Sequence, residues 1–362
     1  AGLGPDRPPL RLLPRLLRLR PHGRRHQVGV PEASHGNRRE SRHRHGLLRE
    51  DRRRGDQAGR RRAAGRRHDP RPRPHDRPHP AGGVAPDRAP AGAARGARQP
   101  GRREGLTIDH PPINLFDRAL MLDIHHVGKA LAADEGVRVI VFDSANPDFF
   151  IAHADVTLIQ RMPAEVEPKA ATLGFFHAMV ERFRTMPKVS IAKLEGRARG
   201  GGSEFVLSLD LRFGALGRAI LSQPEVALGI LPGGSGTQRL PRIVGRGRAL
   251  EIVLGCEDFP ADLAERYGWL NRALPPAELG PFVERLAYRI ASFPAEAIAL
   301  AKASVNAAEL PTPEGLLEEA HLFNRSVVTP AARKRMARFL ERGGQTREAE
   351  LDLGTMLETL AD

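Results

Sequence analysis

The chain divides near residue 104 into two parts of different composition, and only the second part can build a folded domain. Residues 1–104 contain no Ile, Met, Phe, Tyr, Trp, Thr, Cys or Lys and consist mostly of Arg, Pro, Gly, Ala, Leu and His. Such a segment cannot bury enough apolar surface to offset the conformational entropy lost on folding. We therefore expect residues 1–104 to form a disordered, basic, low-complexity tail.

The charge divides at the same place. Residues 1–104 hold 28 of the 57 basic and 10 of the 43 acidic side chains, a net charge of +18. The remaining residues hold 29 basic and 33 acidic side chains, a net charge of −4. The overall charge of +14 therefore describes the tail and gives no reason to expect a basic domain.

Three interpretations of the tail remain open. The arginine runs at 52–54 and 60–62 suit contacts with nucleic-acid phosphates, but the aromatic residues that stack on bases are absent. A transit peptide is rich in Ser and poor in acids, which this segment is not. The third interpretation is a GC-rich gene read upstream of its start or out of frame, since the missing residue types largely have A/T-rich codons. We favour the third and do not expect nucleic acid as a partner.

Residues 105–362 are long enough for one large domain with a sizeable core. Cys256 is the only cysteine, which excludes an intrachain disulfide and a cysteine metal cluster and fits a reducing compartment. No apolar run approaches the length of a transmembrane helix. These observations predict a soluble, cytoplasmic protein without a metal site or a membrane partner.

Apolar periodicity predicts alternating strands and helices as far as about residue 234, and helices after it. The predicted strands are 137–142, 189–194, 211–215 and 219–221, and residues 106–109 are what remains of a first strand. The predicted helices are 117–132, 168–185, 203–208, 278–292, 294–308, 313–327 and 331–340. This order predicts an α/β fold with a core at 105–290 and a helical C-terminal region at 291–362.

Two segments carry groups that suit chemistry at a carbonyl compound. Residues 200–204 read G-G-G-S-E, so backbone N–H groups can approach a ligand at the positive end of a helix. Residues 223–225 read Q-P-E, which places Glu225 21 positions after Glu204. Two carboxylates beside exposed N–H groups can move a proton while a negative oxygen is stabilised.

Two more segments complete a resemblance. Residues 149–156 read F-F-I-A-H-A-D-V, and residues 229–240 read G-I-L-P-G-G-S-G-T-Q-R-L. The four segments together resemble the crotonase superfamily of enoyl-CoA hydratases and isomerases, whose members carry F-x-A-G-A-D, G-G-G-x-E, Q-P-E and G-x-x-P-G-x-G-G-T-Q-R-L in this order. The resemblance extends from about residue 106 to about residue 339. It implies a spiral of repeated β-β-α units followed by a helical region that forms homotrimers or hexamers.

The resemblance also implies an activity and a role for each site residue. The backbone N–H groups of Ala152 and Gly201 would form an oxyanion hole, while Glu204 would act mainly on water and Glu225 on the alpha carbon. The implied reaction is hydration of a 2-enoyl-CoA to a 3-hydroxyacyl-CoA, with CoA as part of the substrate and no cofactor. The apolar neighbours of both glutamates predict raised carboxyl pKa values.

Three further residues are candidates for substrate binding. His153 stands where the superfamily has glycine, so its imidazole can lie near the acyl group, although the sequence shows no partner for it. Arg199 precedes the glycine triplet and either meets a CoA phosphate or, as we favour, is solvated or forms an ion pair. Gly233 belongs to the fourth segment.

Two alternatives to hydration remain. Isomerisation, thioester hydrolysis and decarboxylation use the same oxyanion hole, although isomerases of this superfamily can work with a single glutamate. A non-catalytic, RNA-binding member of the superfamily would instead use the arginine-rich tail. The sequence predicts neither the acyl-chain length nor the pathway.

Overall fold

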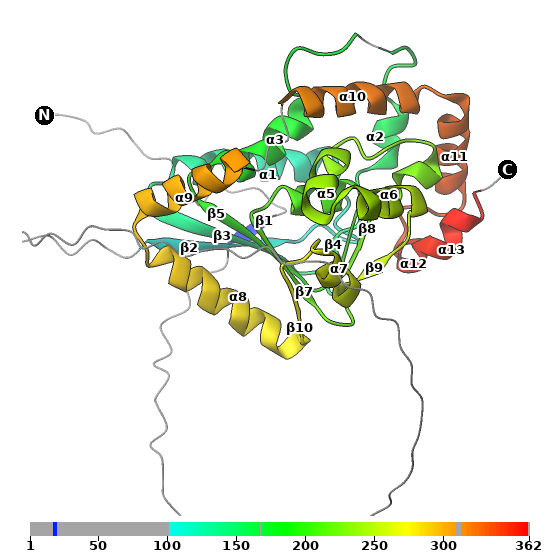
Figure 1. The fold of residues 1–362 in the computed structure, drawn as a ribbon. Coiled ribbons are helices and arrows are strands. Elements are labelled where there is room, and N and C mark those ends of the chain that lie inside the picture. The colour runs from blue at the N-terminus through cyan, green and yellow to red at the C-terminus, as the bar shows by residue number, and fades with distance from the viewer. Residues whose placement is uncertain (1–16, 20–100, 167, 309–312, 361–362) are drawn as a thin grey trace, which may run out of the picture. The chain divides into compact units, whose positions relative to one another are not determined.

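The computed structural model describes residues 17–19, 101–166, 168–308 and 313–360 (Figure 1). The predicted disorder of the tail therefore concerns residues that lie almost entirely outside the described part of the chain. Its last residues do not follow the prediction, because strand β2 spans Arg102–Ile108 instead of beginning at residue 106. β2 pairs with β3 (Val137–Ser144) along its whole length, and Arg102 forms an ion pair with Asp134 at 2.6 Å. These partners stabilise polar strand residues that carry no apolar pattern.

The strands form two sheets. The six-stranded sheet has the order β1-β2-β3-β5-β7-β10 and is parallel except for β1 against β2. The smaller sheet has the order β4-β6-β8-β9. The remaining bounds are β1 (Leu17–Leu19), β4 (Phe149–Ile151), β5 (Val189–Leu194), β6 (Arg197–Arg199), β7 (Leu211–Ala215), β8 (Ile220–Ser222), β9 (Phe259–Pro260) and β10 (Arg272–Leu274).

The two sheets arise from a repeated β-β-α unit. The successive pairs β3/β4, β5/β6 and β7/β8 each place one strand in the larger sheet and the next in the smaller one. Helices α2 (Val156–Gln160) and α3 (Phe175–Thr185) follow the first pair, and α4 (Gly201–Leu207) follows the second. The spiral of β-β-α units expected from the resemblance is therefore confirmed.

Helix α1 (Arg118–Ala133) shows how the sequence pattern specifies the core. Asp117 caps its first turn by accepting a hydrogen bond from the N–H of Leu120 at 2.9 Å. The apolar stripe of the helix, formed by Leu120, Ile124, Val127 and Leu131, is buried and packs in the main core with α3 and α4. Helix α3 is shorter than the predicted 168–185, because it begins after Gly174.

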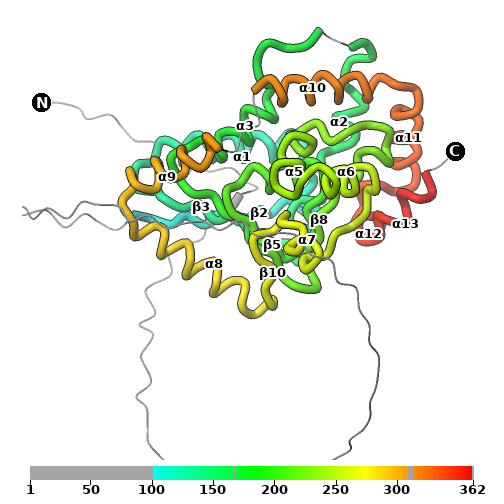
Figure 2. The backbone as a smooth tube through the Cα atoms, viewed as in Figure 1, coloured from blue at the N-terminus to red at the C-terminus, as the bar shows by residue number. Residues whose placement is uncertain are grey.

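The C-terminal third is mostly helical, as predicted, although the short strands β9 and β10 also lie in it. Helix α8 packs on the larger sheet, whereas α11 and α13 pack on the segment after β8 (Figure 2). A second apolar cluster joins the short 3₁₀ helix Glu225–Leu228 to α11 and α13. The bounds are α5 (Gly236–Val244), α6 (Arg246–Gly255), α7 (Ala261–Tyr267), α8 (Pro276–Ala291), α9 (Ala295–Ala308), α10 (Pro313–Val327), α11 (Pro330–Glu341), α12 (Arg347–Leu351) and α13 (Leu353–Glu358).

Candidate active site

The glycine triplet brings three segments into contact, and each glycine permits a different approach. A Cβ on Gly200 would lie 2.9 Å from Oε1 of Glu225, and its φ of +48° favours glycine in any case. A Cβ on Gly201 would lie 3.0 Å from the Cβ of Ala154, and one on Gly202 would lie 2.5 Å from the carbonyl oxygen of Ile151. The triplet is therefore more than a turn, because it holds α4 against both the β4 loop and Glu225.

The predicted oxyanion donor Ala152 is wrong. Its N–H donates to the carbonyl oxygen of Ile113 at 3.3 Å, and its side chain is fully buried beside Ile113. Ala154, two residues later, forms a parallel β-bridge with Phe116. Its neighbours make the hydrogen bonds of this bridge: the N–H of Phe116 donates to His153, and the N–H of Asp155 donates to Phe116. The N–H of Ala154 consequently points away from Phe116, and it has no hydrogen-bond partner in the described part of the chain.

Ala154 and Gly201 place two backbone N–H groups close together, in place of the predicted pair Ala152 and Gly201. A Cβ on Gly201 would lie 3.4 Å from the amide nitrogen of Ala154, so the two backbone segments are adjacent. Gly201 is the first residue of α4, where an N–H has no acceptor within the helix. Two adjacent N–H groups at a helix start suit a developing oxyanion. The sequence carried no signal for which residue of the loop bonds back to Ile113.

Glu204 lies in the first turn of α4 and is almost completely buried. Its Oε1 accepts hydrogen bonds from the N–H groups of Gly234 at 2.7 Å and Gly236 at 2.8 Å. Burial, reinforced by the nearby charge of Glu319, raises the pKa of Glu204 to about 8, although the two N–H donors oppose this shift. The fourth sequence segment therefore holds one of the two predicted catalytic carboxyl groups.

Glu319 was not predicted from the sequence, and it contacts the same loop, which follows Gly234. It is on α10, is 1% exposed, and accepts from the N–H of Ser235 at 2.6 Å and of Gln238 at 3.2 Å. Oε2, which accepts from Ser235, also lies 3.2 Å from Nε2 of His177. Glu319 thus caps the start of α5 and fixes the loop that binds Glu204. Its position on the apolar face of α10, three residues after Leu316, was the available signal.

Glu225 begins the 3₁₀ helix that follows β8, and it is buried beside the glycine triplet. With its amide nitrogen turned toward the carboxyl group, Gln223 donates to the two oxygens of Glu225 at 3.1 and 3.2 Å. Burial, followed by the charge of Glu204, raises the pKa of Glu225 well above its ordinary value of 4.5. Both glutamates therefore have the raised pKa values that the sequence predicted.

A small cavity of about 30 Å³ connects the N–H pair with Glu225. Gly200, Gly201, Ala154 and Glu225 are part of its lining. The rest is mostly apolar and includes Leu228 and side chains from the C-terminal helices, namely Phe339, Leu353 and Leu357. The cavity thus brings a buried carboxyl group and two N–H donors together with apolar side chains, and its volume is about that of one water molecule.

The three candidate substrate-binding residues contact other parts of the protein. His153 directs Nε2 to Oε1 of Glu350 at 2.8 Å. Arg199 is fully buried, and its Nε and Nη2 bind the carboxylate of Asp258 at 2.8 and 2.6 Å, so the ion-pair interpretation is correct and a direct contact with a CoA phosphate is not. Gly233 allows close packing, because a Cβ there would lie 2.3 Å from Phe323.

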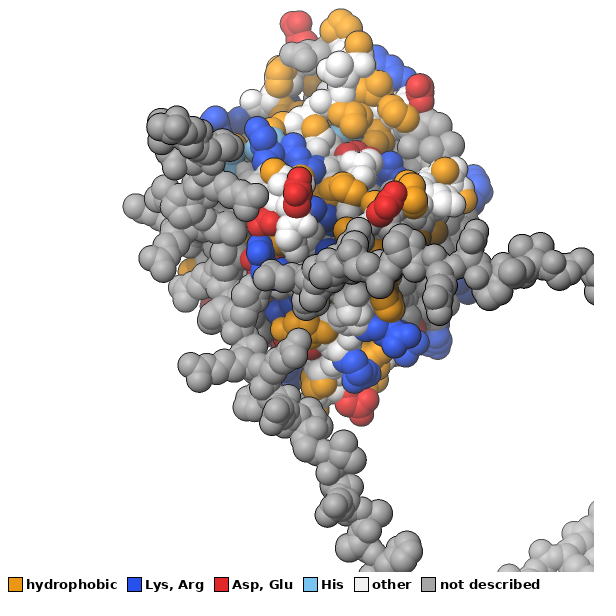
Figure 3. Space-filling view, turned by 90° about the vertical axis from the view of Figure 1, so that its left-hand side faces the viewer, with side chains coloured by type: hydrophobic (Ala, Val, Ile, Leu, Met, Phe, Trp, Pro, Cys, Tyr) orange, Lys and Arg blue, Asp and Glu red, His pale blue; other side chains and the backbone are white. Residues whose placement is uncertain are grey.

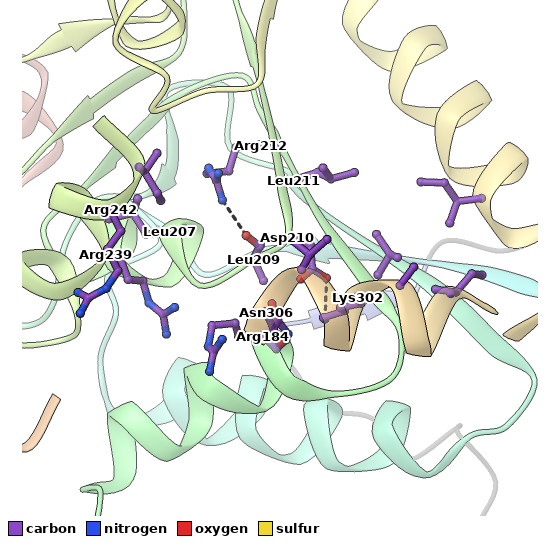
Figure 4. A pocket seen from close by; sticks show the side chains of 16 residues that line it. Arg184, Leu207, Leu209, Asp210, Leu211, Arg212, Arg239, Arg242, Lys302 and Asn306 are labelled. Atoms are coloured by element: carbon purple, nitrogen blue, oxygen red, sulfur yellow. Dashed lines mark hydrogen bonds and ion pairs between the residues drawn. The ribbon is translucent and has the colours of Figure 1, made fainter. Parts of the chain in front are cut away.

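A larger cavity of about 400 Å³ lies at the other end of α4 and contains none of the predicted site residues (Figure 4). Its polar side chains are bonded within the protein. Asp210 pairs with Lys302 at 2.8 Å, and Arg212 donates to the carbonyl oxygen of Leu209 at 2.8 Å. This cavity lacks the adjacent carboxyl groups and N–H donors of the site around Glu225.

The surface gives no sign of a nucleic-acid groove on the face seen in Figure 3. Basic side chains on that face are interspersed with hydrophobic and acidic ones. Among the described residues, no helix is long and apolar enough to cross a membrane. Within the same residues, no group of three His, Cys, Asp or Glu side chains is arranged to hold a metal ion.

The sequence matches the family model described as enoyl-CoA hydratase/isomerase over residues 105–348. It is 33% identical to the crotonyl-CoA hydratase of Syntrophomonas wolfei over 239 residues, which are 66% of this chain and 91% of that protein. It is 30% identical to the short-chain-enoyl-CoA hydratase of Clostridium acetobutylicum over 244 residues, 67% of this chain and 92% of that one.

Solved structures agree with the sequence relatives. A putative enoyl-CoA hydratase from Streptomyces avermitilis is 41% identical and has a TM-score of 0.66, covering 71% of this chain and 94% of its own. The chain belongs to the enoyl-CoA hydratase/isomerase family, and the crotonase resemblance drawn from the four segments is confirmed.

Proposed function

We propose that the protein is an enoyl-CoA hydratase that adds water across the double bond of a 2-enoyl-CoA to give a 3-hydroxyacyl-CoA. The observation that carries this proposal is the pair of buried carboxyl groups, Glu204 and Glu225, with raised pKa values beside the N–H groups of Ala154 and Gly201. Membership of the family, with relatives named as hydratases, supports it.

The two N–H groups stabilise charge on the thioester oxygen. When water adds to the beta carbon, the carbonyl becomes an enolate, and two backbone donors about 3 Å away lower the energy of that oxyanion. Ala154 and Gly201 provide these donors without any side chain. The apolar side chains that line the same cavity exclude bulk water, which strengthens both hydrogen bonds.

The two carboxyl groups divide the proton transfers. Because repulsion between two buried carboxylates disfavours double ionisation, the pair holds one proton over a wide pH range. The two N–H groups that bind Glu204 favour its ionised form, so Glu204 accepts the proton of the attacking water. Glu225 accepts from the side-chain amide of Gln223, and burial and the charge of Glu204 raise its pKa well above the ordinary value, so Glu225 holds the proton and gives it to the alpha carbon. The double bond becomes a single bond, and proton exchange restores the pair.

An assay with 2-enoyl-CoA and 3-enoyl-CoA thioesters of several lengths tests this function. Hydration removes the conjugated absorbance of a 2-enoyl-CoA, whereas isomerisation of a 3-enoyl-CoA creates it. We expect the first reaction to be the faster one, because both glutamates are present. Formation of conjugated product without hydration would assign the protein to the isomerases.

Other properties expected from the sequence stay predictions. We infer that an acyl-CoA thioester is the substrate and that no cofactor is required, so a chelator should leave turnover unchanged. A homotrimer or hexamer and a cytoplasmic location are likewise inferred from the resemblance. Light scattering of the purified protein tests the assembly.

A further inference from the structure

A buried carboxylate near the C-terminus links the two segments that supply the oxyanion hole. Glu350, on α12, is completely buried, and its Oε1 accepts from Nε2 of His153 at 2.8 Å. Nη1 of Arg199 donates to the main-chain carbonyl of Glu350 at 2.7 Å and lies 3.9 Å from its Oε2. His153 precedes Ala154, and Arg199 precedes the glycine triplet. One residue therefore contacts the neighbour of each N–H donor segment.

The contact with the Ala154 loop has two further supports. Nδ1 of His153 lies 2.8 Å from the carbonyl oxygen of Ala154, so the imidazole bridges that peptide to Glu350. Gln345, just before α12, accepts from the N–H of Val156 at 2.6 Å and donates its own N–H to Glu350 at 3.0 Å. The segment 345–350 thus holds residues 153–156 at two points.

Stability alone is a weak reason for this network. Taking an imidazolium, a guanidinium and a carboxylate out of water costs several kcal/mol per ion, and apolar residues often replace such groups without loss. His153 also occupies a position where the crotonase segment has glycine, so the bridge is a feature of this chain. Burial opposes the charged imidazole, but Glu350 outweighs it, and the pKa of His153 is raised. Both ring nitrogens can then donate, one to each neighbour.

An oxyanion hole depends on accurate placement, because hydrogen bonds weaken steeply with misalignment and a displacement of about 1 Å can cost a hundredfold in rate. The Ala154 loop and the start of α4 come from different β-β-α units, and both are irregular at this point. We propose that Glu350 is a positioning residue that, through His153 and Arg199, fixes the N–H groups of Ala154 and Gly201 for the thioester oxygen. This role rests on the proposed function of the site.

Substitution of Glu350 in the full-length protein tests the proposal by kinetics. Glu350→Ala should lower kcat about tenfold to a hundredfold while KM changes little, since the interaction matters most in the transition state. Glu350→Gln keeps an oxygen that accepts from His153 and should recover most of the loss. Glu348→Ala, at an exposed position on the same helix, is the control and should match wild type.

A spectroscopic readout separates this role from turnover. Butyryl-CoA has no double bond to hydrate, and hydrogen bonding lowers the stretching frequency of its isotope-labelled thioester carbonyl when it binds. In Glu350→Ala this frequency should move back toward the value of free butyryl-CoA. A wild-type protein that binds butyryl-CoA and lowers the frequency, but hydrates no enoyl-CoA, would refute the proposed function and leave the positioning role intact.

Three results would overturn the positioning role. The first is a folded Glu350→Ala variant with wild-type kcat and carbonyl frequency. The second is a Glu350→Gln variant as impaired as Glu350→Ala. If Glu350→Ala does not fold, His153→Ala decides, because it removes the same bridge and leaves Glu350 against Arg199. Wild-type kcat and frequency in that variant would be the third contradicting result.

Discussion

Two clusters of buried side chains contact the Ala154 loop and the glycine triplet, and they differ in the charge that their glutamates face. Glu204 and Glu225 face other carboxyl groups, and their pKa values are raised by burial and then by that repulsion. Glu350 is equally buried but faces His153 and Arg199, which outweigh the effect of burial and lower its pKa. The difference teaches that partners, and not burial alone, decide whether a buried glutamate can exchange protons or only hold structure.

The largest effect is expected when either of the two proton-exchanging glutamates, Glu204 or Glu225, is replaced. Glu204→Gln and Glu225→Gln should each lower the hydration rate at least about a hundredfold, because general acid–base groups contribute about 10²–10⁴. Binding of butyryl-CoA should change only slightly. Exposed Glu348→Gln is the matched control. Near-normal turnover by either variant would remove that glutamate from the reaction.

Loss of one oxyanion donor should have the next largest effect. Gly201→Pro deletes an N–H at the first position of α4, where proline is tolerated, and should lower kcat about 10²–10³-fold. Gly201→Ala keeps the N–H, but its Cβ would lie 3.0 Å from that of Ala154, so a smaller loss is expected. Equal impairment of the two variants in a steady-state assay would show that crowding, and not the missing donor, is responsible.

The buried glutamates of the two clusters should also give opposite dependences of stability on pH. Glu204 has a pKa of about 8 in the folded protein and an ordinary value of 4.5, so the folded state binds the extra proton and stability falls as pH rises through this window. The pKa of Glu350 is lowered, so its contribution is present above 4.5 and is lost as pH falls through the folded value.

Urea unfolding from pH 4 to about pH 8 measures these slopes. Glu204→Gln should unfold at higher urea than wild type at the alkaline end, whereas Glu350→Gln should flatten the acid end. A Glu204→Gln variant that loses stability most at alkaline pH would contradict the raised pKa and the comparison built on it.

The smallest effect is expected outside both clusters. A chain that begins at Arg102 keeps all of β2 and loses β1, which pairs only with β2 at the edge of the larger sheet. It should fold, hydrate at a rate near that of the full chain, and run as a trimer or hexamer. Light scattering beside the thioester assay checks this, and a monomeric or inactive product would give the tail a structural role.

Local patterns predicted much of the fold. The stripe on α1, the long strands β3, β5 and β7, and helices α8 to α11 all carry apolar periodicity, which records how each segment meets the core. Strands β4 and β6 were not predicted, although the equally short β8 was, and Arg197 and Arg199 place charge inside β6. Their pairing depends on neighbours supplied by other β-β-α units.

The site residues also divide into those that a local motif predicted and those that only the fold brings together. Glu204, Glu225 and Gly201 were predicted because their segments carry local motifs. Ala152 was wrong because the choice of donor depends on a backbone bond to Ile113 in another loop. Glu350 lies 197 positions from His153, and only the fold brings them together. Motifs therefore predicted the two glutamates and the glycine that the structure brings together, whereas the groups that contact them arise from tertiary contacts.

The most direct test of the central claim is mass spectrometry of a 2-enoyl-CoA incubated with the protein in isotopically labelled water. If Glu204 and Glu225 add water across the double bond, the wild-type product gains one labelled water molecule, with its oxygen on the beta carbon, and Glu204→Gln forms that product at least about a hundredfold more slowly. An unlabelled or isomerised product from the wild type, or equal labelling by Glu204→Gln, would contradict the account.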